Sequence, residues 1–484
     1  MKRKNTNKRR WALWLTVIIL LATTALFSAE EIGKRLGLMM GQTQRSDPFK
    51  FGEVSQIPRR HKSGGAGASA SANNLLDHVA KRPSRPINSE DVKNNPEWKN
   101  RYRVGTERDT IDIQEAILKG SKVKLPPGDY LIDQPLRFRN GLILSGAGVR
   151  LIGTAGLAAK GFLLDGVEDL TIRGITFWDI SLTIKNSQNI TLDNVAFVQK
   201  RAEALTKPQI QVLSVTNGFR VHESQFVRSA QAPGMGISVE SSEKVYVRYS
   251  SFMGAFETAL EAVGACEKVK ECNLGTKVEP RYDERFQNRQ VLFEGNKLHR
   301  KNLKKKAGYG IHLWGVQGAK ILKNKITGWP MIASSGCIKI GNGEALLVSG
   351  NRCDAGLLLE HSRIHPRYLR NVTIENNTIR IRTENIPKGW ESKYEQWLPG
   401  SPRRTAIDYA GIIARRDFQE DLELTEFMES EISIQANTVK NGLIQISGIR
   451  PSALSVDSNV ASLCRWVKDL KTGSDNACTI HESR

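Results

Sequence analysis

The stretches that recur in this chain are FEGNKL (293–298), ILKNKI (321–326), VSGNRC (348–353), IENNTI (374–379), IQANTV (434–439) and VDSNVA (456–461). Each begins and ends with an apolar residue, and each carries an asparagine at its fourth position. Asparagine tolerates the left-handed backbone of a tight corner. Its amide group can also bond to the same amide on a neighbouring copy of the repeat. The six stretches therefore predict a stack of coils with one asparagine at the same corner of each.

The apolar pair of this pattern also occurs earlier in the chain, without the asparagine. It recurs at Ile172, Leu192, Val221 and Val247, and the second apolar residue of each pair is Phe177, Phe197, Phe226 or Phe252. The position of the asparagine is there taken by Ile175, Val195, Ser224 and Ser250. Most repeats are 20 to 29 residues apart, about the length of a three-strand coil. The pattern predicts an all-β fold, a right-handed single-stranded parallel β-helix whose asparagine ladder covers only the C-terminal half.

The sequence before the first coil predicts a cap. Residues 109–120 (DTIDIQEAILKG) place Ile111, Ile113, Ala116 and Ile117 near one helical face, and Asp109 or Thr110 is suited to cap the helix. Then KVKLPPGDYLI (122–132) alternates like a strand around a turn. This opening resembles that of the pectate-lyase-like (pectin lyase-like) β-helix superfamily. The resemblance implies the fold, over 104–484, and action on a polymer, but not a particular reaction.

The N-terminal region predicts export. Residues 1–10 are basic, 11–29 are apolar and uncharged, and 30–103 are mostly polar with GGAGASASA at 64–72. The predicted order is a cytoplasmic segment, a transmembrane signal anchor and a flexible linker. A cleaved signal peptide is the alternative. In both cases the C-terminal body lies outside the cytoplasm, in the periplasm or outside the cell, and the membrane is expected to be a bacterial inner membrane.

The charge predicts a polyanionic partner. The formal net charge is +21. Subtracting the six cations of residues 1–10 leaves about +15 on the remainder. An acidic polysaccharide, phosphorylated lipid headgroups or nucleic acid would fit, and export argues against nucleic acid. A generally basic surface with no specific partner is the alternative. The expected state is a monomer.

Six cysteines follow the predicted anchor, and their order suggests three local disulfides in an oxidising compartment. The pairs would be Cys266–Cys272, Cys337–Cys353 and Cys464–Cys478. Their spacing does not match a zinc site, so no metal site is predicted.

A second strand of each coil predicts an outward-facing column. The residues nine positions before the first apolar residue of a repeat are Leu163, Thr183, Val212, Ser238, His312 and Lys339. The similar strands ALEAV (259–263) and AIDYA (406–410) add Glu261 and Asp408, and Leu358 or Glu360 would lie between Lys339 and Asp408. Stacked coils lie about 4.8 Å apart, so Glu261, His312 and Lys339 would project side by side. An acid, an imidazole and an amine suit proton abstraction and anion binding. Polar side chains on a wet surface are the alternative.

Further residues near the same face are candidates for binding substrate. They are Tyr309, Trp314, Asn342, His361, Arg363 and Arg415, together with Trp390 and Trp397 on a basic insertion at 385–404. Aromatic rings beside cations suit stacking on sugars and pairing with anions. Surface side chains, and a loop packed on the solenoid, are the alternatives.

Enzyme motifs known on this fold are missing. GCIKIG (336–341) resembles the region of the polygalacturonase acid pair, but Ser334, Ser335 and Gly336 precede the cysteine. The Asp-Pro-His tripeptide of alginate epimerases is absent. The clustered acids of the pectate-lyase calcium site are not apparent, so no cofactor is predicted and calcium is unsupported. The preferred hypothesis is uronate C5 epimerisation or β-elimination on an acidic exopolysaccharide. The alternatives are a non-catalytic polysaccharide-binding or assembly protein, and a glycoside hydrolase using Glu261 and Asp408.

Overall fold

The computed structural model describes residues 105–202, 204, 207–229, 234–264, 288–301, 308–330, 335–362, 368–381, 410–416, 429–440, 443–461, 463–467 and 475–477. The predicted anchor and linker at 1–103 lie outside these residues. Within the described part of the chain, no helix is long and apolar enough to cross a membrane.

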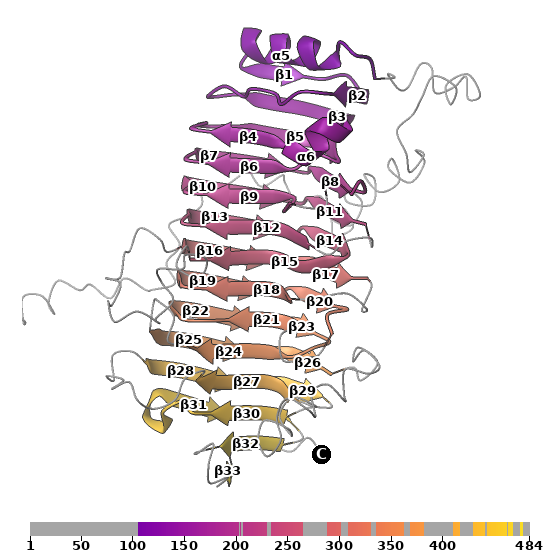
Figure 1. Ribbon diagram of the computed structural model, residues 1–484. Helices are drawn as coiled ribbons and strands as arrows, with labels where there is room; N and C mark the ends of the chain where they lie inside the picture. Colours follow the sequence, from indigo (N-terminus) through magenta and orange to yellow (C-terminus); the bar gives the residue numbers. More distant parts are fainter. Residues whose placement is uncertain are drawn as a thin grey trace, which may run out of the picture. The chain divides into compact units, whose positions relative to one another are not determined.

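The chain winds into a stack of coils, each of which contributes strands to long parallel ladders (Figure 1). One ladder, the front sheet, contains β4 (Phe162–Asp165), β6 (Leu182–Lys185), β9 (Ile210–Leu213), β12 (Gly234–Glu240), β15 (Phe256–Val263), β18 (Tyr309–Trp314), β21 (Gly336–Ile340), β24 (Leu357–His361), β27 (Ala410–Arg416), β30 (Leu443–Ser447), β32 (Leu463–Val467) and the antiparallel β33 (Asp475–Ala477).

The second ladder carries the first apolar residue of every repeat. It contains β5 (Thr171–Trp178), β7 (Gln188–Asp193), β10 (Thr216–His222), β13 (Glu243–Arg248), β16 (Asn288–Glu294), β19 (Val316–Leu322), β22 (Gly343–Ser349), β25 (Leu369–Glu375), β28 (Glu429–Gln435) and β31 (Leu454–Asp457).

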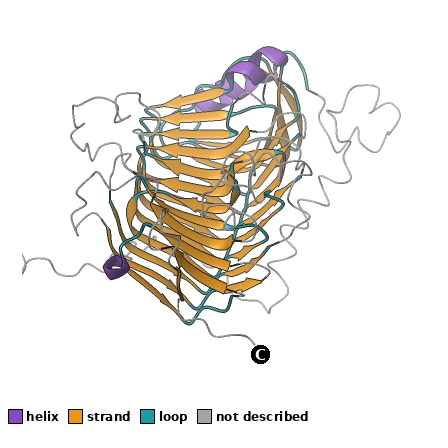
Figure 2. Ribbon diagram, turned by 60° about the horizontal axis from the view of Figure 1, so that its bottom comes forward, coloured by secondary structure: helices purple, strands orange, loops and turns teal. Residues whose placement is uncertain are grey.

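The third ladder follows the asparagine corner and carries the second apolar residue. It contains β8 (Ala196–Gln199), β11 (Gln225–Arg228), β14 (Ser251–Gly254), β17 (Lys297–Arg300), β20 (Lys325–Thr327), β23 (Arg352–Cys353), β26 (Thr378–Arg380) and β29 (Thr438–Lys440). Figure 2 shows these strands as stacked layers with a helix over one end. The predicted parallel β-helix is confirmed.

The register of the repeats is confirmed as well. Ile172 pairs with Leu192, and the first apolar residue of each repeat pairs with that of the next, through to Ile434 and Val456. These side chains point into the solenoid, and all but the partly buried Val456 are buried. The apolar repeat therefore specifies the core.

Aromatic side chains fill the core of the N-terminal coils. Phe177, Phe197, Phe226 and Phe252 occupy one column, and their ring centroids are 4.7, 5.5 and 4.4 Å apart in successive pairs. The rings are nearly parallel, because identical residues at identical positions of stacked coils adopt the same orientation.

The asparagine ladder is present from Asn296 to Asn459. Each side-chain amide nitrogen donates to the amide oxygen of the next rung at 2.9–3.0 Å, and each rung's oxygen also accepts the backbone N–H of the rung before it. The rungs are almost fully buried.

One detail of the predicted ladder is wrong. The left-handed residue is not the asparagine but the one before it, such as Lys323, Asn376 or Ala436, with φ between 52° and 55°. The asparagine ladder covers only the C-terminal half, as predicted. Serines extend its hydrogen bonding toward the N-terminus, since the Asn296 side-chain oxygen accepts from the Ser250 N–H, and the Ser250 hydroxyl accepts from the Ser224 N–H.

The N-terminal cap is α5 (Asp109–Lys119), followed by β1 (Lys122–Lys124), β2 (Gly128–Ile132), β3 (Ile143–Gly153) and α6 (Ala155–Lys160). Helix α5 covers the end of the solenoid through the buried Ile113 and Ile117 (Figure 1). Ile111, predicted on the same face, is 54% exposed. The N-cap residue is Arg108, without a side-chain hydrogen bond. Asp109 instead accepts the backbone N–H groups of Thr106 and Leu131, so it ties the helix to β2.

Candidate functional site

The outward column of the front sheet brings the predicted site residues together. Ser238 pairs with Glu261, Glu261 with His312, and His312 with Lys339, on four consecutive strands from β12 to β21. Because neighbouring strands of a sheet lie about 4.8 Å apart, the four side chains form a continuous row. The sequence placed these four residues correctly.

Two other members of the predicted column are wrong. Val212 is buried in the core, and Gln211 pairs with Thr183 and Ser238 in its place. This coil has one extra residue within β10, where the register shifts between Thr216 and Phe219, so counting back nine residues selects the wrong side of the strand. In the later coils the column continues through Leu358 and then Ile413. Asp408 lies outside the described residues, and Ile413 holds the position predicted for it.

Glu261 joins the row into a hydrogen-bonded unit. The Ser238 hydroxyl donates to Glu261 Oε2 at 3.0 Å, and His312 Nδ1 lies 3.3 Å from Glu261 Oε1. A carboxylate only accepts, so this contact places the ring hydrogen on Nδ1 and leaves the Nε2 lone pair of the neutral ring for other work. His312 Nε2 is buried and has no hydrogen-bond partner in the described part of the chain.

Lys339 is held by a carboxylate that the sequence placed only as an alternative. Its Nζ lies 2.9 Å from Glu360 Oε2, and the other oxygen of Glu360 accepts from Arg415 Nε at 2.8 Å. Burial raises the pKa of the Glu360 carboxyl, but the charges of Lys339 and Arg415 outweigh it and hold that pKa below its ordinary value. Lys339, Glu360 and Arg415 together therefore carry one net positive charge at neutral pH.

Two aromatic rings flank this ammonium group. Lys339 Nζ lies 5.0 Å from the ring centroid of Trp314 and 5.9 Å from that of Tyr309. The Tyr309 ring is in turn 6.0 Å from the His312 ring. Tyr309 and Trp314, predicted as candidates for binding substrate, thus lie beside the imidazole and the amine. Both rings are largely buried.

Asn342 and His361 have structural partners. The Asn342 side chain accepts the Ser362 N–H and donates to the Ser362 carbonyl, both at 2.7 Å, which fixes the corner after β21. His361 is fully buried, and its Nδ1 lies 2.9 Å from Glu429, which also binds Arg416. Burial raises the pKa of Glu429, yet the His361 and Arg416 contacts hold it below its ordinary value. Arg363, Trp390 and Trp397 lie outside the described residues.

The predicted Cys337–Cys353 disulfide is wrong in this structure. Both cysteines are free and buried. Cys337 Sγ contacts the Ile326 carbonyl oxygen at 3.6 Å, and burial raises the pKa of its thiol well above the ordinary value. Cys353 fills an apolar position between Ile326 and Ile379 of the adjacent coils. Both behave as small core residues.

The remaining four cysteines, Cys266, Cys272, Cys464 and Cys478, cannot be placed as pairs, because their side chains are not among those described. The side chain of Cys464 is not described, and Cys266, Cys272 and Cys478 lie outside the described residues. Across the described ranges, histidine, cysteine, aspartate and glutamate side chains form no group of three or more suited to hold a metal ion.

No family model matches this chain, and no curated protein matches it. Among solved structures, it is similar to the surface protein and adhesin PfbA of Streptococcus pneumoniae, with 14% identity over 73% of this chain and 91% of that one, at a TM-score of 0.36. It is also similar to a PL6 alginate lyase in complex with a trisaccharide, with 11% identity over 75% of this chain and 84% of that one, at a TM-score of 0.37.

A third similar structure is the catalytic domain of a GH87 α-1,3-glucanase in complex with nigerose. It is 10% identical over 78% of this chain and 67% of that one, at a TM-score of 0.29. These similarities are too distant to carry a functional argument. The parallel β-helix implied by the pectate-lyase-like resemblance rests on the strand pairing itself.

Proposed function

We propose that this chain binds an acidic polysaccharide and cleaves it at a uronate residue by β-elimination. The observation that carries the proposal is the row in which Glu261 holds His312 directly beside Lys339. Removal of a proton next to a carboxylate requires a base and a cation. Here the base is His312, whose Nε2 has no hydrogen-bond partner in the described part of the chain, and the cation is Lys339. We further propose that residues 11–29 anchor the protein in a bacterial inner membrane with its body exported.

The chemistry assigns one role to each residue. His312 Nε2 removes the C5 proton of the uronate, and the electron pair of the C–H bond moves toward the carboxylate. Lys339, whose ammonium group has three donors, stabilises the resulting enolate while one donor stays with Glu360. The enolate then forms a C4–C5 double bond as the C4–O bond breaks, and the departing oxygen takes back the proton that His312 Nε2 removed from C5. Glu261 positions the imidazole and stabilises its protonated form.

Epimerisation is the neighbouring possibility, and it shares the first step. It requires a proton to return to the opposite face of C5. The imidazole and the ammonium group both project from the same sheet. A syn elimination, in which the proton and the departing oxygen leave from one face, needs only that side of the sugar, and for this reason it is preferred.

A non-catalytic polysaccharide-binding or assembly protein is the second candidate. The burial of His312 Nε2 favours it, since a substrate has to displace neighbouring groups to reach that atom. The predicted glycoside hydrolase is less favoured, because Ile413 takes the column position expected for Asp408, its second acid.

The test uses the full-length protein and a panel of uronate polymers, with the absorbance of the unsaturated uronate as the readout. We expect His312→Ala to abolish turnover and Thr183→Ala, at a neutral position of the same column, to keep it. Cleavage by His312→Ala at the unmodified rate would refute the assignment. Deuterium entering C5 without cleavage would identify an epimerase, and binding with neither change would identify a binding protein.

A further inference from the structure

The third ladder presents a row of cations on another face of the solenoid. Five consecutive coils each contribute one exposed lysine or arginine from this ladder. These residues, here named the cation strip, are Lys297, Lys325, Arg352, Arg380 and Lys440. The five strands that carry them, β17, β20, β23, β26 and β29, contain no acidic residue.

The strand register places the first three members in a single column. Lys297 pairs with Lys325, and Lys325 with Arg352. The column continues through Thr378, and two residues further along their strands Arg380 and Lys440 pair with each other. Successive charges in this column are thus about one strand spacing apart, roughly 4.8 Å, whereas Arg380 lies diagonally from Arg352, about 7–8 Å away.

These cations differ from three arginines on the second ladder, which have acidic partners. Arg173 is paired with Asp193, Arg248 with Glu294, and Arg370 with Glu344. Members of the cation strip have no ion pair within the described ranges. Like charges opposite each other in a sheet are destabilising, so the strip does not serve the stability of the fold. An anion from outside the chain would relieve the repulsion.

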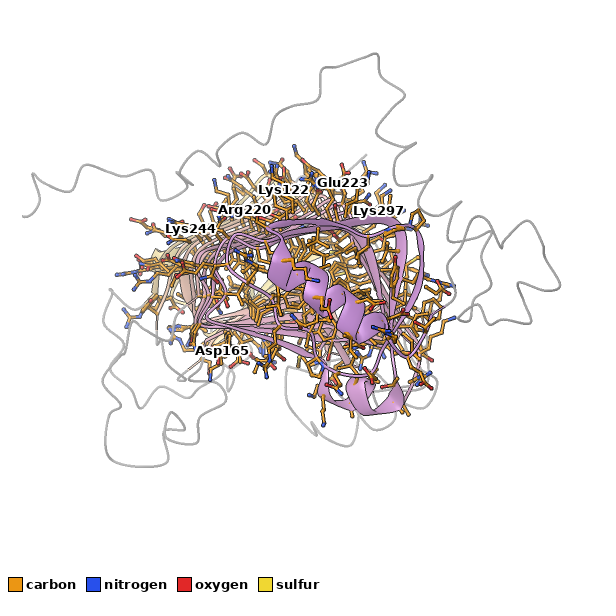
Figure 3. The ribbon with its side chains drawn as sticks, turned by 90° about the horizontal axis from the view of Figure 1, so that it is seen from above. Lys122, Asp165, Arg220, Glu223, Lys244 and Lys297 are labelled. Atoms are coloured by element: carbon orange, nitrogen blue, oxygen red, sulfur yellow. The ribbon has the colours of Figure 1, made fainter. Side chains whose placement is uncertain are left out.

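The strip lies away from the proposed catalytic row. Figure 3, which looks along the stack, shows Lys297 and Asp165 on opposite sides of the coil with their side chains pointing outward. Asp165 belongs to β4 of the front sheet, and Lys297 belongs to β17 of the third ladder. A ligand on the strip therefore does not occupy the His312 site.

We propose that the cation strip is a second binding surface for a linear polyanion that runs along the solenoid axis, and that this polyanion is an acidic polysaccharide. One charge per coil, at a spacing comparable with the length of one sugar residue, suits a polymer with a regular charge on each unit. No Phe, Tyr or Trp occurs in the five strands, so the strip lacks the large stacking platforms typical of single-stranded nucleic-acid sites. The choice of a uronate polymer rests on the proposed function.

The test compares two triple variants of the full-length protein with the same loss of charge. Lys297→Gln, Lys325→Gln and Arg352→Gln remove the strip's column, whereas Lys122→Gln, Lys124→Gln and Lys185→Gln remove three exposed cations elsewhere. We expect the Kd for alginate or polygalacturonate to rise about tenfold in the first variant, with a shallower salt dependence, and to change less than about twofold in the second. Uncharged dextran should not bind.

Several outcomes would overturn the proposal. They are an equal loss of polyuronate affinity in both triple variants, no loss of affinity in either, or tighter binding of single-stranded DNA than of the polyuronates at the strip. A melting curve of each variant confirms that it is folded. Two further measurements separate this proposal from the proposed function. The strip variant should process a short uronate oligosaccharide normally, and His312→Ala should bind polymer normally even if no turnover is ever found.

Discussion

The coils up to Phe252 and the coils from Leu298 onward stack in the same register but are stabilised differently. The earlier coils hold a column of phenylalanine rings, and serine hydroxyls close their corners at Ser224 and Ser250. In the later coils the same column is mostly aliphatic, as at Leu298 and Ile326, and asparagine amides close the corners.

The outer face of the front sheet changes at the same place. Its column is neutral from Leu163 to Ser238 and becomes charged at Glu261, in the strand that follows Phe252. The two sets of coils thus stack in the same register although different side chains fill them and project from them. The charged column begins in the coil whose corner carries Asn296.

The largest effect on stability is expected from the aromatic column. Phe226→Ala should lower the free energy of unfolding by about 4 kcal/mol, because it opens a cavity between two stacked rings. Ile326→Ala, at the corresponding position of the later half, should cost about 3 kcal/mol. Urea denaturation measures both. Gln225→Ala, at an outward position, is the control and should stay within about 0.5 kcal/mol. Equal small losses in both halves would contradict the cavity argument.

A slightly smaller effect is expected in the charged group of the later half. Glu360→Gln leaves Lys339 and Arg415 without their counter-charge, and at neutral pH it should cost about 2–3 kcal/mol, reduced by the partial exposure of both cations. Since the folded-state pKa of Glu360 lies below its ordinary value of 4.5, its contribution is present above that value and is lost as the pH falls through the folded pKa.

The difference in stability between Glu360→Gln and the unmodified protein should therefore be largest near neutral pH and close in acid. Urea denaturation at a series of pH values measures it. A difference that does not change with pH would show that the Glu360 carboxylate charge is not what stabilises the group.

A substitution in the middle of the asparagine ladder should lower the free energy of unfolding less than the core substitutions or Glu360→Gln. Asn351→Ala removes the acceptor of the Asn324 backbone N–H and of its side-chain amide, and should cost about 2 kcal/mol. Hydrogen exchange should show faster opening of the Asn324 amide. Thr378→Ala, exposed on the neighbouring coil, is the control and should leave both measurements unchanged.

The smallest effect is expected in the earlier coils, whose corners carry a serine at the position that asparagine holds in the later coils. Ser224→Ala removes one acceptor, that of the Val195 N–H, and should cost about 1 kcal/mol in urea denaturation. A loss as large as that of Asn351→Ala would mean that the serine corners are as important to the fold as the ladder, and that the two halves do not differ in this respect.

The repeat made the fold readable from the sequence. One apolar pair and one asparagine recur in every later coil, so each copy supports the others, and the column of Glu261, His312 and Lys339 follows once the register is known. Val212 was misplaced because a single extra residue within β10 shifts the count, and a shift of one residue exchanges inward and outward positions along a strand. Glu360 and its partners depend on the directions of long side chains, which no spacing in the sequence specifies.

The cation strip has a consequence for motion. Because the coils of Lys297, Lys325 and Arg352 present cations at equal spacing, moving a bound polyanion by one coil along this column exchanges each contact for a similar one. The interaction energy is then nearly periodic along the axis, with low barriers between adjacent positions. Such a surface retains a polymer without fixing its register and lets it diffuse in one dimension. The front-sheet row, whose residues differ from coil to coil, selects a single position.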